Sequence, residues 1–179
     1  MLRLRCGSFG MKGICIVVVL VLALVTSSAQ SLSCIKTNHL FFIERNKNKN
    51  LVQYDVCMKD GTELTDQFPV KAYWILENGE KETLNMLENK LVYGIHSQRK
   101  LGTNRYVINL TALKTRDIIV EKVGDDYKAI LLIDGKQSYL EKVYVESEER
   151  WSGLPKVHYV DVFGSSVNTN TPVKERLTP

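Results

Sequence analysis

"HLFFIERNKNKNLVQYDV", residues 39–56, is the stretch that decides the fold, because it places two apolar segments around six polar residues. In the second segment, "LVQYDV", apolar and polar side chains alternate, which is typical of a half-buried strand in an antiparallel sheet. The six residues from Arg45 to Asn50 are three cations and three asparagines. Asn tolerates the left-handed backbone of a tight turn and Lys keeps a loop soluble, so we expect a β-hairpin with these residues at its tip.

The same signals continue along the chain. Short apolar runs alternate with turn sequences such as "KDG" at 59–61 and "IDGK" at 133–136, and the connections are too short for helical crossovers. We therefore predict an all-β fold, an antiparallel meander that forms a β-sandwich or β-barrel with at most one short helix. The expected strands are 39–45, 50–58, 69–77, 81–85, 89–97, 104–111, 116–123, 126–134, 137–147 and 156–163.

Two segments depart from simple alternation. In "SYLEKVYV" the apolar phase slips between Leu140 and Val143, which predicts a bulge or bend. In the stretch 83–90 and just beyond it, Leu84, Leu87 and Leu91 fit the apolar stripe of a helix of barely two turns.

The N-terminal segment has the order of a secretory signal peptide, residues 1–29. Basic residues precede an apolar run from Ile14 to Val25, and Ser27 and Ala29 follow at the positions before a cut. Twelve apolar residues span roughly 18 Å as a helix, less than a hydrocarbon core of about 30 Å. A retained membrane anchor and lipid attachment to Cys34 are the alternatives. We expect an exported protein, periplasmic or secreted.

The remainder of the chain fits one domain. Removal of residues 1–29 lowers the formal charge from +4 to +1, because this segment carries three cationic residues and no acidic residue. A nearly neutral chain argues against nucleic acid or an anionic membrane as the main partner. We expect a single all-β domain over residues 30–164. Residues 165–179 form a C-terminal extension, packed on the domain or frayed from it.

Two cysteines remain after signal removal, Cys34 and Cys57, and an exported chain allows them to oxidise. In a hairpin centred on Lys47 and Asn48, Cys57 lies opposite Asn38. Cys34 then lies about 13 Å further along a straight strand, whereas a disulfide needs Cα atoms within about 7 Å. A bridge requires the chain before His39 to fold back, and the sequence leaves both states open.

No motif in the chain diagnoses a chemistry. His39, His96 and His158 are far apart in the sequence, and metal-ligand motifs are missing, so we predict neither a metal site nor a cofactor. G-x-S-x-G and phosphate-binding glycine loops are also missing. Carboxylates for a glycosidase are available, as on many exported β-proteins, at Glu44, Asp55, Glu146 and Asp161.

Three stretches supply candidate ligand-binding residues. In "IERNKNKN" the asparagines recur at a period of two, so an extended chain places their amides on one side as possible hydrogen-bonding groups. "VKAYWI" is apolar on both faces, and "LVYGIHS" has a glycine that permits close approach. A solvated hairpin tip and ordinary core packing are the alternatives. The candidates are Glu44, Arg45, Asn46, Asn48, Tyr54, Tyr73, Trp74 and Tyr93.

These stretches also carry a resemblance. Together with "DGKQSYLEKVYVES", "VHYVDVFG" and "TPVKER", they resemble an uncharacterised family of exported, mostly bacterial domains, catalogued as a domain of unknown function. The resemblance covers nearly all of residues 39–177. It implies one exported domain, supplies no activity, and adds Pro69 and Gly94 to the positions of interest.

Three functions are compatible with these observations. The leading hypothesis is a non-enzymatic exported binding module for a small molecule, a glycan or an envelope protein. The second is a cell-envelope hydrolase or lyase with Glu44 as acid or base and Arg45 holding an anion, which requires both residues and Tyr93 to converge in one concave site. The third is a structural or assembly component that pairs a sheet edge with a partner.

Overall fold

The computed structural model describes residues 34, 36–59, 63–65, 68–148 and 155–179. The predicted signal peptide lies outside the described residues. Residues Cys34–Pro179 form one compact unit with its own hydrophobic core. Within the described ranges, no helix has the length and apolar character needed to cross a membrane.

Most of the described residues lie in β-strands, and the all-β prediction is confirmed. In chain order the elements are β1 (Lys36–Arg45), β2 (Asn48–Met58), β3 (Val70–Ile75), β4 (Lys81–Thr83), α2 (Met86–Leu91), β5 (Ile95–Gly102), β6 (Arg105–Leu110), β7 (Leu113–Val123), β8 (Asp126–Ile133), β9 (Lys136–Glu148), β10 (Lys156–Ser166) and β11 (Pro172–Leu177).

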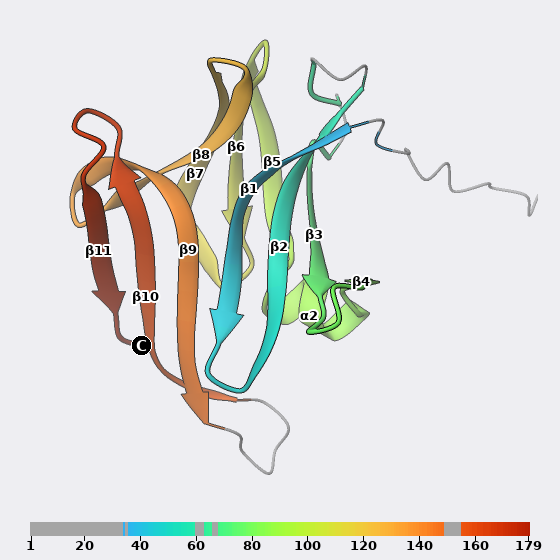
Figure 1. Cartoon of the computed structure of the whole chain (residues 1–179), viewed down its shortest axis with the longest axis vertical. Helices are drawn as coiled ribbons and strands as arrows, with labels where there is room; N and C mark the ends of the chain where they lie inside the picture. Colours follow the sequence, from blue (N-terminus) through green and yellow to red (C-terminus); the bar gives the residue numbers. More distant parts are fainter. Residues whose placement is uncertain (1–33, 35, 60–62, 66–67, 149–154) are drawn as a thin grey trace, which may run out of the picture. The chain divides into compact units, whose positions relative to one another are not determined.

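The strands form one curled sheet with the shape of a half-barrel (Figure 1). Their order is β4-β3-β2-β1-β9-β8-β7-β6-β5, and β10 pairs with β9 and β11. Every pair is antiparallel except β1 with β9, which is parallel. The predicted meander did not include this parallel pair, because local turn signals cannot reveal pairing between strands that lie so far apart in the sequence.

Strand β9 joins the two halves of the sheet because it is long enough to pair with two strands along one edge. Residues 136–139 pair with β8, and residues 142–145 pair with β1. In its pairing with β10, the register skips Glu141, between Leu140 and Lys142. The bulge predicted in this stretch is therefore confirmed, and it bends β9 from one partner to the next.

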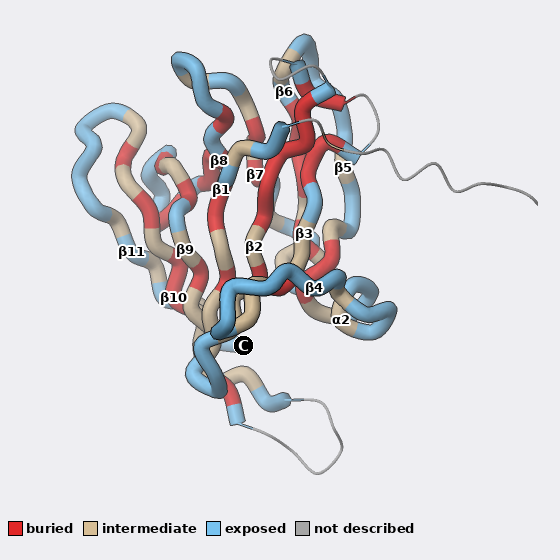
Figure 2. Tube along the Cα trace, turned by 45° about the vertical axis from the view of Figure 1, so that its right-hand side comes forward, coloured by how far each residue is buried: buried red, intermediate tan, exposed pale blue. Residues whose placement is uncertain are grey.

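The inner face of the half-barrel holds the core, as the buried positions along the strands show (Figure 2). The core-facing residues predicted in β2 are correct, since Val52, Tyr54 and Val56 are fully or almost fully buried. The strand is not half-buried throughout, because Asp55 and Cys57 on its other face are buried as well. Tyr54 stacks on Phe41 of β1 with ring centres 4.4 Å apart. The side chain of Tyr54 is therefore a core element and does not face solvent.

The segment after β4 is helical where a strand over 89–97 was predicted, and that prediction is wrong in its first part. Asn85 and Glu88 form a capping box that starts α2, each side chain bonding the other's backbone N–H. The predicted apolar stripe is not buried, because Leu87 is 68% exposed and Leu91 is 55% exposed. A Cβ on Gly94 would lie 1.8 Å from the carbonyl oxygen of Asn89, so this glycine permits close approach to the helix end.

The β1–β2 hairpin turns one residue earlier than predicted. Arg45 pairs with Asn48, so the turn residues are Asn46 and Lys47. Irregularities in the ladder then place Cys57 opposite Thr37 and not opposite Asn38. Cys34 and Cys57 form a disulfide with Cα atoms 5.1 Å apart.

The C-terminal residues 172–177 form β11, which lies along the outer edge of β10. Val173 and Leu177 are partly buried and pack against the core. Arg176 forms two hydrogen bonds of 2.7 Å with the carboxylate of Asp161 on β10. The hairpin of β10 and β11 thereby extends the half-barrel.

Candidate functional site

Arg45 ends β1 on the inner side of the half-barrel, among aromatic side chains. Its guanidinium carbon lies 4.8 Å from the centre of the Trp74 ring and 5.7 Å from the centre of the Tyr93 ring. The two rings meet edge to face, with centres 5.2 Å apart. Three of the predicted site residues therefore come together, from β1, β3 and the segment after α2.

A cavity of about 120 Å³ lies beside this cluster. Its walls are mainly aliphatic and come from β1, the β6–β7 turn, β9 and β10. Arg45 and Tyr93 supply charged and aromatic groups at one side. The lining residues are Ile43, Arg45, Val92, Tyr93, Leu110, Ala112, Leu113, Val143, Val145, Ser147, Pro155, Val157 and Val160.

The charge of Arg45 is not neutralised within the described part of the chain. Its Nε atom is buried and has no hydrogen-bond partner there, and no described carboxylate forms an ion pair with its guanidinium. A half-buried cation without a counter-charge is less stable than a paired one, and the aromatic faces compensate only part of this cost. Arg45 thus brings a positive charge to the edge of an apolar cavity, and one of its donors is unsatisfied.

Two features of this site, burial and the charge of Arg45, affect the pKa of the Tyr93 hydroxyl. Burial raises the pKa of its hydroxyl, while the neighbouring Arg45 guanidinium acts in the opposite direction. Its backbone is fixed on two sides, because its N–H donates to the Glu88 carbonyl (2.8 Å) and its carbonyl accepts from the Tyr54 hydroxyl (2.5 Å). Tyr93 is therefore held in place by both the helix end and the core.

Glu88 holds the ring of Trp74 in position through a hydrogen bond. Its carboxylate accepts a 3.1 Å hydrogen bond from Trp74 Nε1 and a 2.9 Å bond from the backbone N–H of Asn85. Glu88 was not among the predicted site residues, although the spacing "NMLE" at 85–88 is a capping signal that could have revealed it. The aliphatic wall of the cavity was not predicted either, since those residues look like ordinary strand positions.

A comparison with protein-family models matches residues 41–176 to a family described as a domain of unknown function, DUF4833. The chain belongs to the DUF4833 family. The predicted membership in a family of unknown function is confirmed. Neither the comparison with curated proteins nor the comparison with solved structures found a match.

The other predicted residues of this DUF4833 domain do not line the cavity. Glu44 forms a 2.9 Å ion pair with Lys142 of β9, so its carboxylate does not meet the Arg45 guanidinium. Glu44 and Arg45 are consecutive residues of a strand, where neighbouring side chains point to opposite faces. The convergence that the hydrolase or lyase hypothesis requires is therefore not found in the described residues.

The asparagines of the hairpin tip bond to the domain itself. The Asn46 amide donates to Glu146 Oε1 (2.6 Å) and to the Ser147 carbonyl (2.9 Å), and its oxygen accepts from the Ser147 N–H (3.2 Å). Asn46 thus extends the β1–β9 pairing beyond the strand end. The Asn48 oxygen accepts a local 3.2 Å bond from the Asn50 N–H.

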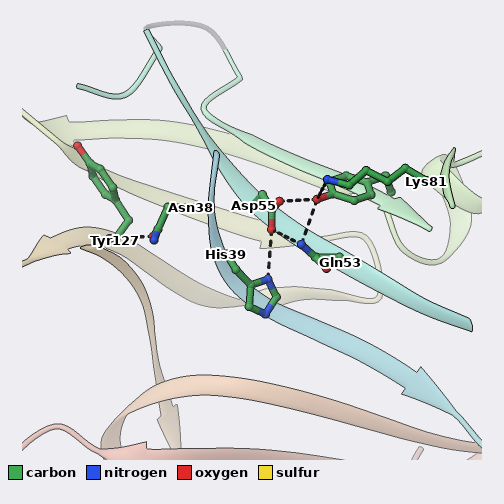
Figure 3. Close-up of polar contacts among 7 residues, drawn as sticks. Asn38, His39, Gln53, Asp55, Lys81 and Tyr127 are labelled. Atoms are coloured by element: carbon green, nitrogen blue, oxygen red, sulfur yellow. Dashed lines mark hydrogen bonds and ion pairs between the residues drawn. The ribbon is translucent and has the colours of Figure 1, made fainter. Parts of the chain in front are cut away.

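A second polar cluster of the DUF4833 domain surrounds Asp55 (Figure 3). Asp55 is 3% exposed, and its carboxylate contacts His39 Nδ1 (3.1 Å), Gln53 Nε2 (2.9 Å) and the Tyr73 hydroxyl. Lys81 Nζ in turn lies 3.0 Å from that hydroxyl. Because strand neighbours alternate, this cluster faces away from Tyr54 and the core. Tyr73 therefore lies on the opposite face from Trp74.

The pKa values in this second cluster follow its hydrogen bonds. Burial alone would raise the pKa of Asp55, but the bonds from His39, Tyr73 and Gln53 hold it below the ordinary value. Burial and the neighbouring Asp55 raise the pKa of the Tyr73 hydroxyl. Both oxygens of the Asp55 carboxylate are bonded within the cluster. Within the described ranges, no group of three His, Cys, Asp or Glu residues is placed to hold a metal ion.

Proposed function

We propose that this domain is an exported, non-enzymatic binding module that holds a small amphipathic anion in the inner-face cavity. The observation that carries the proposal is Arg45, which lines the apolar cavity and whose buried Nε has no hydrogen-bond partner in the described part of the chain. A carboxylate in the cavity would pair with the Arg45 guanidinium in a charge-assisted hydrogen bond, which is about twice as strong as a neutral one.

The size of the cavity limits the ligand. An apolar cavity of roughly 150 Å³ accepts benzene, and this one measures about 120 Å³. A single ring or a short alkyl chain fits this space, with the anionic group at Arg45. Benzoate and hexanoate are therefore suitable probes, and the sites of larger glycans or whole proteins would have to lie elsewhere.

Export is part of the proposal. It is supported by the order of charges, apolar run and small residues in the segment 1–29. It is also supported by the Cys34–Cys57 disulfide, which persists in an oxidising compartment. After signal removal we expect the domain to act in the periplasm or outside the cell.

Isothermal titration calorimetry of the domain from residue 30 onward tests the proposal. Benzoate should bind, whereas benzyl alcohol, which keeps the ring and lacks the charge, should bind about tenfold more weakly or worse. Arg45→Gln should abolish this preference. Arg105→Gln is the matched control, because Arg105 pairs with Glu121 (2.9 Å) and does not line the cavity. Equal binding of acid and alcohol, or no binding of benzoate or hexanoate, would refute the proposal.

A further inference from the structure

Two strand edges of the half-barrel face a second cleft, which is separate from the Arg45 cavity. β5 is the last strand of the sheet order and pairs with β6 alone among the described strands. On the other side, β4 covers β3 at residues 73–75, which leaves the edge at residues 70–72 uncovered by strand pairing. The half-barrel is thus open between β3 and β5.

On this part of β3, the backbone groups of every second residue point into the opening. Cys57 of β2 donates its N–H to the carbonyl of Pro69, so Pro69 faces β2. Because backbone groups alternate in direction along a strand, Lys71 also faces β2, while Val70 and Ala72 face the opening. The pairing of Trp74 with Glu82 of β4 agrees with this alternation.

The side chain of Gln98 bonds to the β3 edge in the way that the backbone of an added strand would. The carboxamide of Gln98 on β5 accepts a 3.1 Å bond from the Val70 N–H and donates a 3.2 Å bond to the Val70 carbonyl. A peptide group of a neighbouring strand would offer the same donor and acceptor. Gln98 therefore bridges two edges that do not pair through their backbones, and it occupies the position of an added strand.

The strand directions fit one added segment. From β3 to β5 through the sheet there is one parallel pair and six antiparallel pairs, so β3 and β5 run in the same direction. A single segment placed between them would be antiparallel to both. Neighbouring strands lie about 4.8 Å apart, so the two edges would stand roughly 10 Å apart after insertion.

The surroundings indicate what kind of segment fits. The cleft measures about 350 Å³ and is lined by Phe68, Val70, Lys71, Ala72, Asn89, Ile95 and Gln98. Phe68 is 71% exposed and has a positive φ of 51°, which is unusual for a bulky residue. On the outer side, Lys71 and Arg99 are exposed cations on the two strands that border the opening.

We propose that this cleft accepts an extended segment of a partner protein in which aliphatic and acidic residues alternate. The segment adds a strand between β3 and β5 and displaces the Gln98 carboxamide from Val70. Its aliphatic side chains pack on Phe68 and Ile95, and its acidic side chains lie near Lys71 and Arg99. Affinity comes from the backbone bonds and selectivity from the alternating side chains.

The test uses the domain from residue 30 onward and a fluorescently labelled, capped peptide of sequence EVEIEVE. Its binding is measured by anisotropy, and protection of the Val70 and Ala72 amides is measured by hydrogen exchange. The peptide should bind and slow exchange at Ala72. Gln98→Ala should bind it about fivefold more tightly, because the competing carboxamide bonds are gone. The peptide KVKIKVK and a form of EVEIEVE with alternate backbone nitrogens methylated should bind at least tenfold more weakly.

The control for folding is the thermal midpoint of Gln98→Ala, which should stay within a few degrees of the unsubstituted domain. Equal binding of the methylated peptide would overturn the proposal, since it would show that backbone pairing is not used. Absence of binding to both the unsubstituted domain and Gln98→Ala would also overturn it. So would concentration-dependent self-association that protects Ala72 without peptide, because a second copy would then be the occupant.

Discussion

The guanidinium of Arg45 lies 4.8 Å from the centre of the Trp74 ring, while its Nε is buried without a hydrogen-bond partner in the described part of the chain. An aromatic face stabilises a cation without using its hydrogen-bond donors. Arg45 can therefore be held in position by Trp74 and Tyr93 while its positive charge stays without a carboxylate partner among the described residues.

The bond between Trp74 and Glu88 should contribute measurably to stability. Trp74→Phe keeps an aromatic ring but removes the Nε1 donor, which leaves the Glu88 carboxylate with one bond fewer. We expect the free energy of unfolding to fall by about 2 kcal/mol in urea denaturation. The partner variant Glu88→Gln keeps an acceptor and should cost less. A Trp74→Phe domain as stable as the original would contradict this account.

Asn46 should matter more than Asn48, although both are asparagines of the hairpin tip. Asn46→Ala removes three hydrogen bonds to β9, whereas Asn48→Ala removes one local bond. We expect a loss of about 2 kcal/mol for Asn46→Ala and about 0.5 kcal/mol for Asn48→Ala. Urea midpoints of the two variants give the comparison, and equal losses would show that Asn46 does not clamp the strand end.

Asp55 should make the domain sensitive to acid. Its pKa in the folded state is below the ordinary value of 3.8, so the unfolded chain binds the proton more tightly than the folded chain. The stabilisation is complete above pH 3.8 and is lost as the pH falls through the folded-state pKa. Asp161 has a lowered pKa as well, mainly through Arg176, and adds to the same trend.

The variant Asp55→Asn isolates this contribution. Below about pH 4, its stability should fall less steeply with decreasing pH than that of the unsubstituted domain, as measured by urea unfolding between pH 7 and pH 2.5. Tyr73→Phe removes one donor to Asp55 and should give an intermediate slope. Identical slopes in all three proteins would mean that Asp55 has the same pKa folded and unfolded.

Reduction of the Cys34–Cys57 bridge should destabilise the domain. The two cysteines are separated by 23 positions, and closing a loop of this length stabilises a fold by roughly 3 kcal/mol. The paired variants Cys34→Ser and Cys57→Ser should each show this loss under oxidising conditions. The reductant should then have no further effect on either variant, and an additional shift would point to a different bridge.

The sequence predicted those features that depend on local patterns. The core-facing residues of β2, the bulge in β9 and the turn at 133–136 follow from neighbouring residues, and the structure has them. Residues 60 and 61 of the turn predicted at 59–61 lie outside the described residues. The parallel pair of β1 with β9 does not follow, because no local signal links residues 42–45 with residues 142–145. The helix at 86–91 was misjudged in part, since its apolar residues are exposed and its capping box decides its start.

The candidate site was predicted only in part, because the sequence shows local patterns and not contacts between distant strands. Arg45 was selected as a charged residue directly after an apolar run, and Trp74 and Tyr93 were selected as large amphipathic residues within expected strands; the three do meet. Glu44 was selected with Arg45, Tyr73 with Trp74, and Asn46 for the repeat of asparagines at alternate positions, but strand alternation and long-range bonds direct all three to other partners. The cavity itself is formed by ordinary aliphatic residues from distant strands, which a sequence pattern cannot distinguish from core.

The central claim is that Arg45 receives the anionic group of a small amphipathic ligand. The most direct measurement is the ¹H–¹⁵N correlation spectrum of the arginine Nε–H groups during titration with benzoate, with benzyl alcohol as the neutral control. We predict that the Arg45 signal shifts and saturates with benzoate, while benzyl alcohol leaves it nearly unchanged. An Arg45 signal that does not move while benzoate binds elsewhere in the domain would contradict the account.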